Sequence, residues 1–383
     1  MSEEIIEVSA VLPCLNEEDA IGICIKKIKD VFSKENIKGE IIVVDNGSAD
    51  RSAEIAKSLG AKVIYEPVHG YGAAYLRGTK EAKGKYIIMG DGDDTYDFRE
   101  IPKLYKFLRQ DYDFVIGSRF KGKILKGAMS FSHRYIGNPI LTTLLNVFYK
   151  SKISDAHSGF RAITKRALAK LKLKTTGMEF ASEMIVAALR ENLKIAEVPI
   201  TYYPRKGESK LSPLSDAWRH VRFMLIFSPT YLFLIPGLAL FLGGFLVLIF
   251  SGWGKLVILG HRFDVHAMIF SSIIALLGFQ IISLGLYAKT YSFLEGFEKQ
   301  DAFLKKLYHF FNLEKGIILG ILFFIAGTTI SFYIFLKWIR SGFGPLNEVK
   351  AALIGLIFMV TGIQIVFSSF FLSLLSVKKK FNS

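Results

Sequence analysis

Four long apolar stretches in the C-terminal half constrain this chain more than any other feature of its sequence. They lie at about residues 223–250, 266–287, 315–337 and 351–376. Each is close to or above the roughly 20 residues that an α-helix needs to cross the hydrocarbon core of a bilayer. The sequence therefore predicts four membrane-spanning helices. Pro229 and Pro236 fall inside the first stretch, so we expect it to run along the interface and turn or kink before it crosses.

Basic residues in the connecting loops predict the orientation of these helices. The loop 288–315 and the tail are rich in lysine, whereas the loop 251–265 has few basic residues, which places both ends of the membrane region in the cytosol. The N-terminal MSEEIIEVSA lacks the basic flank and apolar run of a signal peptide. We expect a multi-pass protein of the cell membrane with a cytosolic N-terminal domain. The residues counted are Lys289, Lys299, Lys305, Lys306, Lys315 and Lys378 to Lys380, against Lys255 and Arg262; Lys337, Arg340 and Lys350 oppose the assignment.

The N-terminal part of the chain alternates short β-branched runs with amphipathic stretches. This pattern predicts an α/β fold with an open, mainly parallel sheet. One helix is expected from about Glu17 to Phe32, because Ile21, Ile25 and Ile28 fall on one face of it. We divide the chain into residues 1–215, a cytosolic α/β domain, and residues 216–383, a membrane domain with an interfacial helix and four spanning helices. The expected strands are Val8 to Leu12, Glu40 to Asp45, Lys62 to Glu66, Lys85 to Gly90 and Asp113 to Ser118.

Acidic residues follow several of these expected strands. Asp91 and Asp93 come directly after a buried strand, and Asp94 and Asp97 lie beside them. Four carboxylates in one turn repel one another, and hard oxygen ligands suit Mg²⁺ or Mn²⁺. Such an ion would bridge the carboxylates to a diphosphate and stabilise the charge on a departing nucleotide. In an open α/β sheet, ligands bind beyond the carboxyl ends of the strands, which is where this turn lies.

Two further turns have competing interpretations. In Asp45-Asn46-Gly47-Ser48-Ala49-Asp50, Asp45 or Asp50 could accept hydrogen bonds from a base or ribose, or the run could be an Asx turn that caps the next helix. Gly70-Tyr71-Gly72 resembles the start of a dinucleotide fingerprint, but Tyr75 stands where the third glycine should be. On that ground we exclude a NAD enzyme.

The formal net charge of +15 predicts affinity for an anionic partner. Basic residues collect beside the apolar segments and not in an aromatic-studded groove, so we expect no nucleic acid.

Two segments, Met129 to Lys150 and Leu214 to Phe227, are amphipathic and could lie in the membrane interface; an ordinary helix on the sheet is the alternative. Cys14 and Cys24 have no metal-ligand spacing and are expected to be buried packing residues. The sequence leaves a homo-oligomer open.

Several ordered motifs carry a family resemblance: LPCLNEE, VVDNGSAD, GYGAAYLRG, MGDGDD, IGSRF, DAHSGFRA and RKGESKL. With them the chain resembles the family 2 glycosyltransferases and, within these, the dolichyl- and undecaprenyl-phosphate sugar synthases. The resemblance covers about Val8 to Arg222. It implies a Rossmann-like GT-A type domain and inverting transfer of a hexose from a nucleotide sugar, with UDP-glucose or GDP-mannose as donor. The acceptor that it implies is a polyprenyl or dolichyl phosphate.

The resemblance also implies roles for individual residues. Pro13, Glu17, Asp45 and Asp91 would bind the nucleotide, and Asp91 with Asp93 the metal. Catalytic roles would fall to Asp93, Arg119 and Arg205. Two departures stand out: Thr95 occupies a position where mannosyl members often have glutamine, and Asn46 replaces a frequent second aspartate. The residues implied around the acceptor phosphate are Arg119, Arg134, Ser158, Arg205 and Lys210.

A phosphate acceptor is consistent with the scarcity of candidate general bases. A hydroxyl acceptor would need one, and only Glu179 and Glu183 offer themselves. A lipid phosphate is already anionic and needs cations to position it. We therefore expect a single in-line displacement with inversion. The alternatives are a processive or glycolipid-forming enzyme with a hydroxyl acceptor, although the chain lacks its usual QxxRW signature, and a non-catalytic membrane scaffold.

Overall fold

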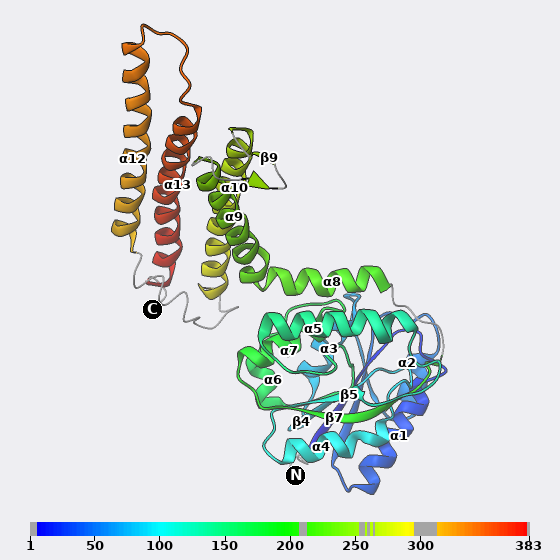
Figure 1. The fold of residues 1–383 in the computed structure, drawn as a ribbon. Coiled ribbons are helices and arrows are strands. Elements are labelled where there is room, and N and C mark those ends of the chain that lie inside the picture. The colour runs from blue at the N-terminus through cyan, green and yellow to red at the C-terminus, as the bar shows by residue number, and fades with distance from the viewer. Residues whose placement is uncertain are drawn as a thin grey trace. The chain divides into compact units, whose positions relative to one another are not determined.

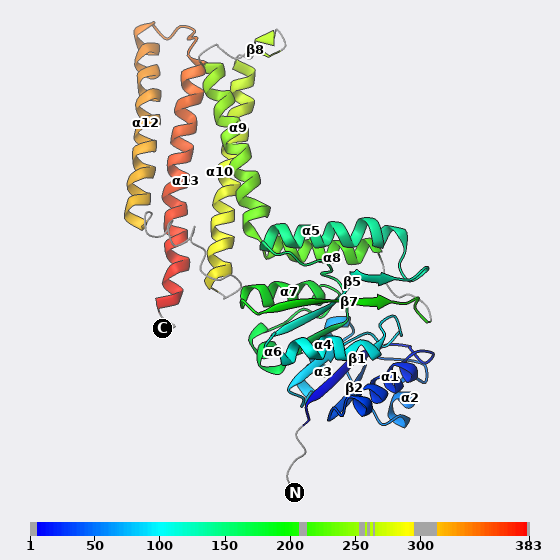
Figure 2. The ribbon, with the colours of Figure 1, turned by 60° about the horizontal axis from the view of Figure 1, so that its bottom comes forward.

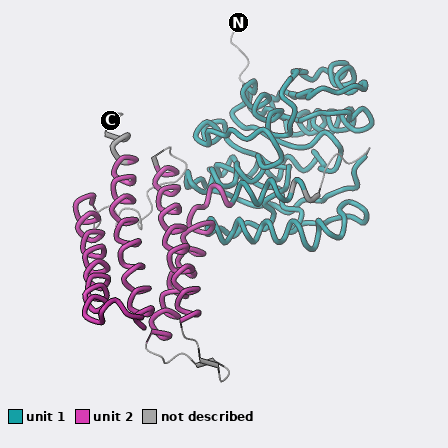
Figure 3. The backbone as a smooth tube through the Cα atoms, turned by 90° about the horizontal axis from the view of Figure 1, so that it is seen from above, with its two compact units in different colours: residues 1–224 teal, residues 225–383 magenta. Residues whose placement is uncertain are grey.

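The computed structural model describes residues 6–206, 213–252, 257–258, 261–262, 265–294 and 312–380. The chain forms two compact units, residues 1–224 and 225–383 (Figure 3). The boundary expected at residue 215 lies inside helix α8 (Pro213–Ile226), whereas the two units divide near the end of that helix.

The first unit is built on a seven-stranded sheet with the strand order β3-β2-β1-β4-β6-β5-β7. All neighbouring strands pair in parallel except β6, which is antiparallel to both β4 and β5. The sheet is thus mainly parallel, as expected. The strands are β1 (Val8–Cys14), β2 (Gly39–Asp45), β3 (Lys62–Tyr65), β4 (Tyr86–Met89), β5 (Phe114–Ile124), β6 (Arg161–Thr164) and β7 (Ile195–Tyr202).

Helices cover both faces of this sheet (Figure 1). Successive residues of a strand point to opposite faces. Ala10 and Leu12 accordingly share a buried cluster with α1, α2 and α4, whereas Val11 packs against Gly78 of α3 on the other face. The helices are α1 (Ile21–Lys34), α2 (Ser52–Ser58), α3 (Tyr71–Glu81), α4 (Ile101–Arg109), α5 (Asn138–Tyr149), α6 (Lys165–Leu171) and α7 (Phe180–Arg190), with a 3₁₀ turn η1 (Phe98–Glu100) and a π-helical turn η2 (His133–Gly137).

All five strands expected from the sequence are present, with ends that differ by a few residues. Strands β6 and β7 were not foreseen, and β6 supplies the antiparallel pairing. The first helix begins at Ile21, later than the expected Glu17, because residues 18–20 form a turn. Its predicted apolar face is confirmed, with Ile21, Ile25 and Ile28 fully buried. Cys14 and Cys24 are buried free thiols, also as expected.

In the described part of the second unit, four helices are long and apolar enough to cross a membrane, as the sequence predicts. A π-helical turn η3 (Thr230–Leu234) begins after Pro229 and forms the start of the first candidate span, so the helical geometry changes next to this proline. The four candidate spans are Thr230–Gly252, Val265–Phe293, Leu313–Arg340 and Val349–Leu375. The helices are α9 (Ile235–Gly252), α10 (Val265–Leu294), α12 (Leu313–Arg340) and α13 (Val349–Lys380), and β8 (Val257–Ile258) pairs with β9 (His261–Arg262).

Glycines let the backbones of these helices approach each other closely. A Cβ atom on Gly320 of α12 would lie 2.7 Å from the carbonyl oxygen of Gly362 on α13, and one on Gly362 would lie 2.6 Å from that of Gly320. Gly244 of α9 meets Ser271 of α10 in the same way. Lipid gives no hydrophobic driving force between helices, so close packing at small residues holds such pairs together.

Candidate active site

The acidic turn after β4 lies where the sequence placed it, at the carboxyl end of a buried strand. Asp91 accepts hydrogen bonds at one carboxylate oxygen from the hydroxyls of Tyr71 at 3.1 Å and Tyr75 at 3.3 Å. Burial and the neighbouring charge of Asp93 raise the pKa of Asp91 to about 7. The hydrogen bonds from the two tyrosine hydroxyls lower the pKa of Asp91 and offset only part of this increase. A divalent cation would favour the ionised carboxylate and lower its pKa again.

Asp93 is held by its own turn and by a basic residue from a distant strand end. Its Oδ1 atom accepts hydrogen bonds from the backbone N–H of Thr95 at 3.1 Å and from the Thr95 hydroxyl at 2.6 Å. Its Oδ2 atom lies 3.3 Å from Nη1 of Arg205. Thr95 therefore orients the carboxylate of Asp93 through its hydroxyl, a role that a glutamine at that position would fill differently.

Two carboxylates fit a divalent metal that shares its coordination sphere with substrate. Among the described residues, no group of three or more His, Cys, Asp and Glu side chains is arranged to hold an ion by itself. Mg²⁺ is commonly held by one or two carboxylates together with phosphate oxygens and water. Asp91 and Asp93 are suited to such a site, because both are carboxylates of the same turn and Asp91 is buried beside the charge of Asp93.

Arg205 connects the end of β1 with the acidic turn. Its guanidinium forms ion pairs with Glu17 and with Asp93. Lys206 follows it and places its ammonium 3.0 Å from Asp94. The Nε atom of Arg205 is buried and has no hydrogen-bond partner. A cation thus lies directly between two of the acidic strand ends, although these residues are far apart in sequence.

The expected nucleotide-binding residues surround the ends of β1 and β2. The carbonyl of Pro13 lies beside the acidic turn, since a Cβ atom on Gly92 would be 3.1 Å from it. Asp45 accepts a hydrogen bond from the backbone N–H of Ser48 at 3.0 Å. Asp50 accepts one from the backbone N–H of Ser52, two residues on, at 2.9 Å, which is an Asx turn of the kind proposed as the alternative interpretation. Burial, together with Asp45 and Glu17, raises the pKa of Cys14 to about 12, so both carboxylates lie near this thiol.

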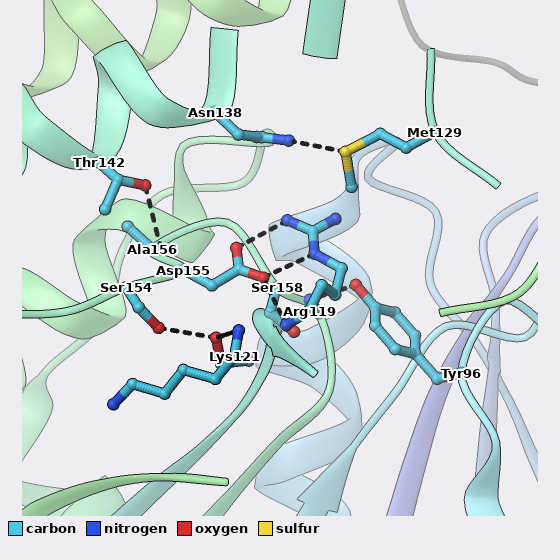
Figure 4. Close-up of polar contacts among 12 residues, drawn as sticks. Tyr96, Arg119, Lys121, Met129, Asn138, Thr142, Ser154, Asp155, Ala156 and Ser158 are labelled. Atoms are coloured by element: carbon cyan, nitrogen blue, oxygen red, sulfur yellow. Dashed lines mark hydrogen bonds and ion pairs between the residues drawn. The ribbon is translucent and has the colours of Figure 1, made fainter. Parts of the chain in front are cut away.

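Arg119 on β5 forms a buried ion pair with Asp155. Two guanidinium nitrogens of Arg119 each donate to a carboxylate oxygen at 2.8 Å (Figure 4). Although burial opposes it, Asp155 keeps the pKa of Arg119 well above its usual value. The guanidinium also lies over the ring of Tyr202, 5.1 Å from its centroid. Asp155 fixes Arg119 in place, which leaves Nη1 as the nitrogen that takes no part in the pair.

The other residues expected at the acceptor phosphate are not all brought together. Ser158 is fully buried, and its hydroxyl has no hydrogen-bond partner. Arg134 lies in the π-helical turn η2, with its guanidinium 5.3 Å from the ring of its neighbour Tyr135. Lys210 lies outside the described residues. Their shared role around a phosphate stays a prediction.

Glu183, one of the two candidate bases, is engaged by the protein itself. Its carboxylate accepts hydrogen bonds from the backbone N–H groups of Lys174 and Thr175 and from the Thr175 hydroxyl, the last at 2.6 Å. Glu183 therefore anchors the loop that precedes α7. Glu179 differs, because one of its carboxylate oxygens is buried without a hydrogen-bond partner.

Several residues that shape the site were not predicted from the sequence. Tyr71 and Tyr75 belong to the GYGAAYLRG motif, which gave them no role of their own, yet both contact Asp91. Gly159 packs so close that a Cβ atom would lie 2.8 Å from an Asp91 oxygen. Asp155 and Gly159 both belong to the DAHSGFRA motif, so the motif marked them, but nothing in the local pattern revealed their partners.

Comparison with known proteins agrees with this geometry. Residues 9–172 match the model of glycosyl transferase family 2, and residues 286–376 match that of the glycosyltransferase family 2 C-terminal transmembrane region. A Haloferax volcanii protein named low-salt glycan biosynthesis hexosyltransferase Agl6 is 42% identical over 366 residues, which are 95% of this chain and 88% of the relative.

Two further proteins are similar over part of the chain. A dolichyl-phosphate hexose transferase of Haloferax volcanii is 31% identical over 211 residues, 55% of this chain and 88% of the relative. Glucosyl-3-phosphoglycerate synthase from Mycobacterium tuberculosis, solved with Mn²⁺, UDP and glucosyl-3-phosphoglycerate, aligns with a TM-score of 0.46 and 22% identity, over 57% of this chain and 77% of its own length. The full-length match to the hexosyltransferase and the two matching family models lead to one conclusion: this chain belongs to glycosyltransferase family 2 and is a hexosyltransferase with a GT-A-like domain and that family's C-terminal transmembrane region.

Proposed function

We propose that this protein transfers a hexose from a nucleotide sugar, UDP-glucose or GDP-mannose, to a polyprenyl or dolichyl phosphate with inversion. An oxygen of the lipid phosphate attacks the anomeric carbon. The bond from that carbon to the diphosphate breaks, and the nucleoside diphosphate leaves with the electron pair. The observation that carries the proposal is the position of Arg205, which lies between Glu17 and Asp93 and joins an acidic donor side to a basic segment.

The donor side consists of the acidic strand ends. Glu17 and Asp45 are suited to hydrogen bonds with the nucleotide, and Asp91 with Asp93 to a Mg²⁺ or Mn²⁺ ion. When bound, that ion would neutralise charge on the diphosphate as the nucleotide leaves. Arg205 and a metal ion would compete for the carboxylate of Asp93. Once the metal and the donor are bound, Arg205 would exchange its contact with that carboxylate for one with a phosphate oxygen.

The acceptor side is basic, and one of the two candidate general bases is already engaged by the protein. Glu183 is held by three hydrogen bonds from its own loop, so it is not available to deprotonate a hydroxyl acceptor. A phosphate needs no deprotonation, only cations that bind it. Nη1 of Arg119, the buried hydroxyl of Ser158 and the side chains of Arg134, Arg205 and Lys210 are the groups that we assign to it.

Exposed apolar side chains support a lipid acceptor. Phe131, just before η2, is 73% exposed, Tyr135 of η2 is 58% exposed, and Ile140 of α5 is 53% exposed. Trp218 of α8 is 59% exposed, and α8 runs beside α5 in both views (Figures 1 and 2). Such amphipathic helices lie in the interface with their apolar side in the acyl boundary. Together with four spanning helices, they would bring a membrane lipid to the active site.

The proposal also covers the two domains, the side of the membrane on which the donor is bound, and assembly. Residues 1–215 form the catalytic domain on the cytosolic side, and residues 216–383 the membrane domain, as the basic loops indicate. The donor therefore comes from the cytosol. Assembly of several copies is compatible with this arrangement and is not required by it.

A lipid-extraction assay tests the proposed function. Membranes that contain the full chain would be incubated with polyprenyl phosphate and a panel of labelled nucleotide sugars, and the label in the organic phase would be counted. We expect label from one donor, a loss of at least a hundredfold in Asp93→Asn, and dependence on divalent metal. The absence of label from every donor would overturn the proposal.

The same assay separates the phosphate acceptor from a hydroxyl acceptor. Polyprenol, which has the same chain but a terminal hydroxyl, replaces polyprenyl phosphate in a parallel reaction. Label in polyprenol at the rate seen with polyprenyl phosphate would favour the glycolipid-forming alternative. Binding of the nucleotide sugar without transfer to either lipid would favour the non-catalytic scaffold.

A further inference from the structure

A cluster of three polar side chains, two buried and one partly buried, lies outside the residues discussed so far. His157 comes from the loop before β6, Ser182 from α7 and His220 from α8. The hydroxyl oxygen of Ser182 lies 2.8 Å from Nδ1 of His220 and 3.3 Å from Nε2 of His157. The two imidazole rings meet edge to face, with centroids 4.4 Å apart. Ser182 is fully buried and His220 is 6% exposed, so this is an interior contact between three elements.

Both rings are neutral at physiological pH. Burial lowers the pKa of His220 to about 4 and that of His157 well below its usual value, and nearby positive charges, including Arg161, act in the same direction. Each ring therefore carries one N–H. The assignment with the fewest unsatisfied donors has Nε2–H of His157 donating to Ser182, and the Ser182 hydroxyl donating to Nδ1 of His220. In this assignment Nδ1 of His157, which is buried without a hydrogen-bond partner, carries no hydrogen and is an unused acceptor. An unused acceptor costs less free energy than a buried, unpaired N–H.

The loop that carries His157 contacts both sides of the active site. Asp155 holds Arg119, and Gly159 packs against the carboxylate of Asp91. The backbone N–H of Gly159 also donates to the Tyr96 hydroxyl at 2.7 Å. The buried Arg161 donates three hydrogen bonds to the carbonyl groups of Ala156, Ser158 and Ala181, each at 2.7 to 2.9 Å. A shift of His157 would therefore move Asp155 and Ser158 with it.

The other end of the cluster lies on the helix that leads into the membrane segment. His220 shares the buried face of α8 with Phe223 and Met224, and Trp218 on the opposite side is exposed. The first candidate span begins at Thr230, a few residues after α8 ends. The hydrogen bond of His220 fixes the position of α8 more precisely than apolar contacts alone would, because a hydrogen bond requires particular atoms at particular distances.

We propose that His220 is a positioning residue for the acceptor site. Through Ser182 and His157 it fixes the loop 155–161 against α8, and so sets where Ser158 and the Arg119–Asp155 pair meet the acceptor phosphate. This inference rests on the proposed function, because it assigns those groups to a lipid phosphate. It predicts that loss of the cluster weakens acceptor binding and leaves donor binding nearly intact.

Steady-state kinetics of the purified full chain test this proposal. His220→Ala and Ser182→Ala should raise KM for polyprenyl phosphate at least fivefold and change KM for the nucleotide sugar by less than twofold. His220→Asn keeps an acceptor near the position of Nδ1 and should restore the acceptor KM to within about twofold of wild type. Ser182→Ala removes one hydroxyl only, so it carries the test if His220→Ala does not fold.

Met224→Ala is the matched control, because it removes packing from the same face of α8 without touching the cluster. If Met224→Ala lowers the melting temperature as much as His220→Ala and raises the acceptor KM equally, the cluster only anchors α8 and the proposal is wrong. Unchanged acceptor KM in Ser182→Ala would overturn it as well. A wild-type protein that labels no lipid would instead overturn the proposed function, so the two failures are distinguishable.

Discussion

The carboxylate of Asp155 binds Arg119 at three points, through two guanidinium nitrogens at 2.8 Å and the backbone N–H at 3.0 Å. Both side chains are almost completely removed from solvent. Arg119 stands in the IGSRF motif and Asp155 in the DAHSGFRA motif, so the pair joins two motifs that the family resemblance treats separately. The arginine is pre-positioned by protein before any substrate arrives, and such a site needs little rearrangement when an anion binds.

Removal of the Asp155 carboxylate should destabilise the protein. Asp155→Ala leaves a buried, unpaired guanidinium, for which we expect a loss of about 3–5 kcal/mol in the free energy of unfolding. Thermal unfolding of the detergent-purified chain, with activity measured in parallel, checks this. Glu54→Ala breaks the exposed Arg51–Glu54 pair and should change neither, because solvent screens such a pair. Equal melting temperatures for the two variants would contradict the prediction.

Metal affinity should depend on pH through Asp91. Its pKa is about 7 in the folded, metal-free protein, above the ordinary 3.8 of an unfolded aspartate. The folded state thus binds this proton more tightly, so the contribution of Asp91 to the free energy of unfolding falls as pH rises from about 4 to about 7. A cation needs the ionised form, and its affinity should rise up to about tenfold per pH unit below 7 and level off above. Mn²⁺ titrations between pH 5.5 and 8 measure this, and Asp91→Asn should abolish the slope.

Asn46→Asp should destabilise the protein even though the family resemblance implies an aspartate at this position. The Asn46 amide nitrogen donates to the carbonyls of Glu66 at 2.9 Å and Val68 at 2.8 Å. A carboxylate cannot donate and would face both carbonyls, at a cost of about 1–3 kcal/mol. Asn36→Asp is the control, since Asn36 is exposed. The melting temperature of Asn46→Asp should recover partly at acidic pH, where the new carboxyl becomes protonated; recovery at alkaline pH would contradict the argument.

Gly362→Ala should separate α12 from α13. The added methyl would lie 2.6 Å from the backbone of both Gly320 and Phe324, and backbone atoms of a packed helix cannot yield separately. Overpacking of this kind typically costs about 1–3 kcal/mol. Gly243→Ala introduces the same methyl on α9 at a site with no atom within 4 Å. The melting temperature in detergent should fall for Gly362→Ala and stay unchanged or rise for Gly243→Ala.

Local sequence patterns predicted the parts of the fold that depend on neighbouring residues. Five strands, the buried face of α1 and the four spans follow from hydrophobic periodicity and segment length. Strand β6 escaped detection because Arg161, its first residue, is buried and polar. That arginine is tolerated because backbone carbonyls accept all its hydrogen bonds, and no local pattern reveals such partners.

The sequence by itself determined that acidic residues end neighbouring strands, that basic residues precede the first membrane segment, and that the C-terminal half is long and apolar enough to span a bilayer. These properties depend on residue type and short spacings. Only the tertiary structure decided that Arg205 meets Glu17 across 188 residues of chain, that Asp155 holds Arg119, and that His220 reaches His157 through Ser182. Such contacts depend on strand order and helix packing, which bring distant segments together and leave no periodic trace in the sequence.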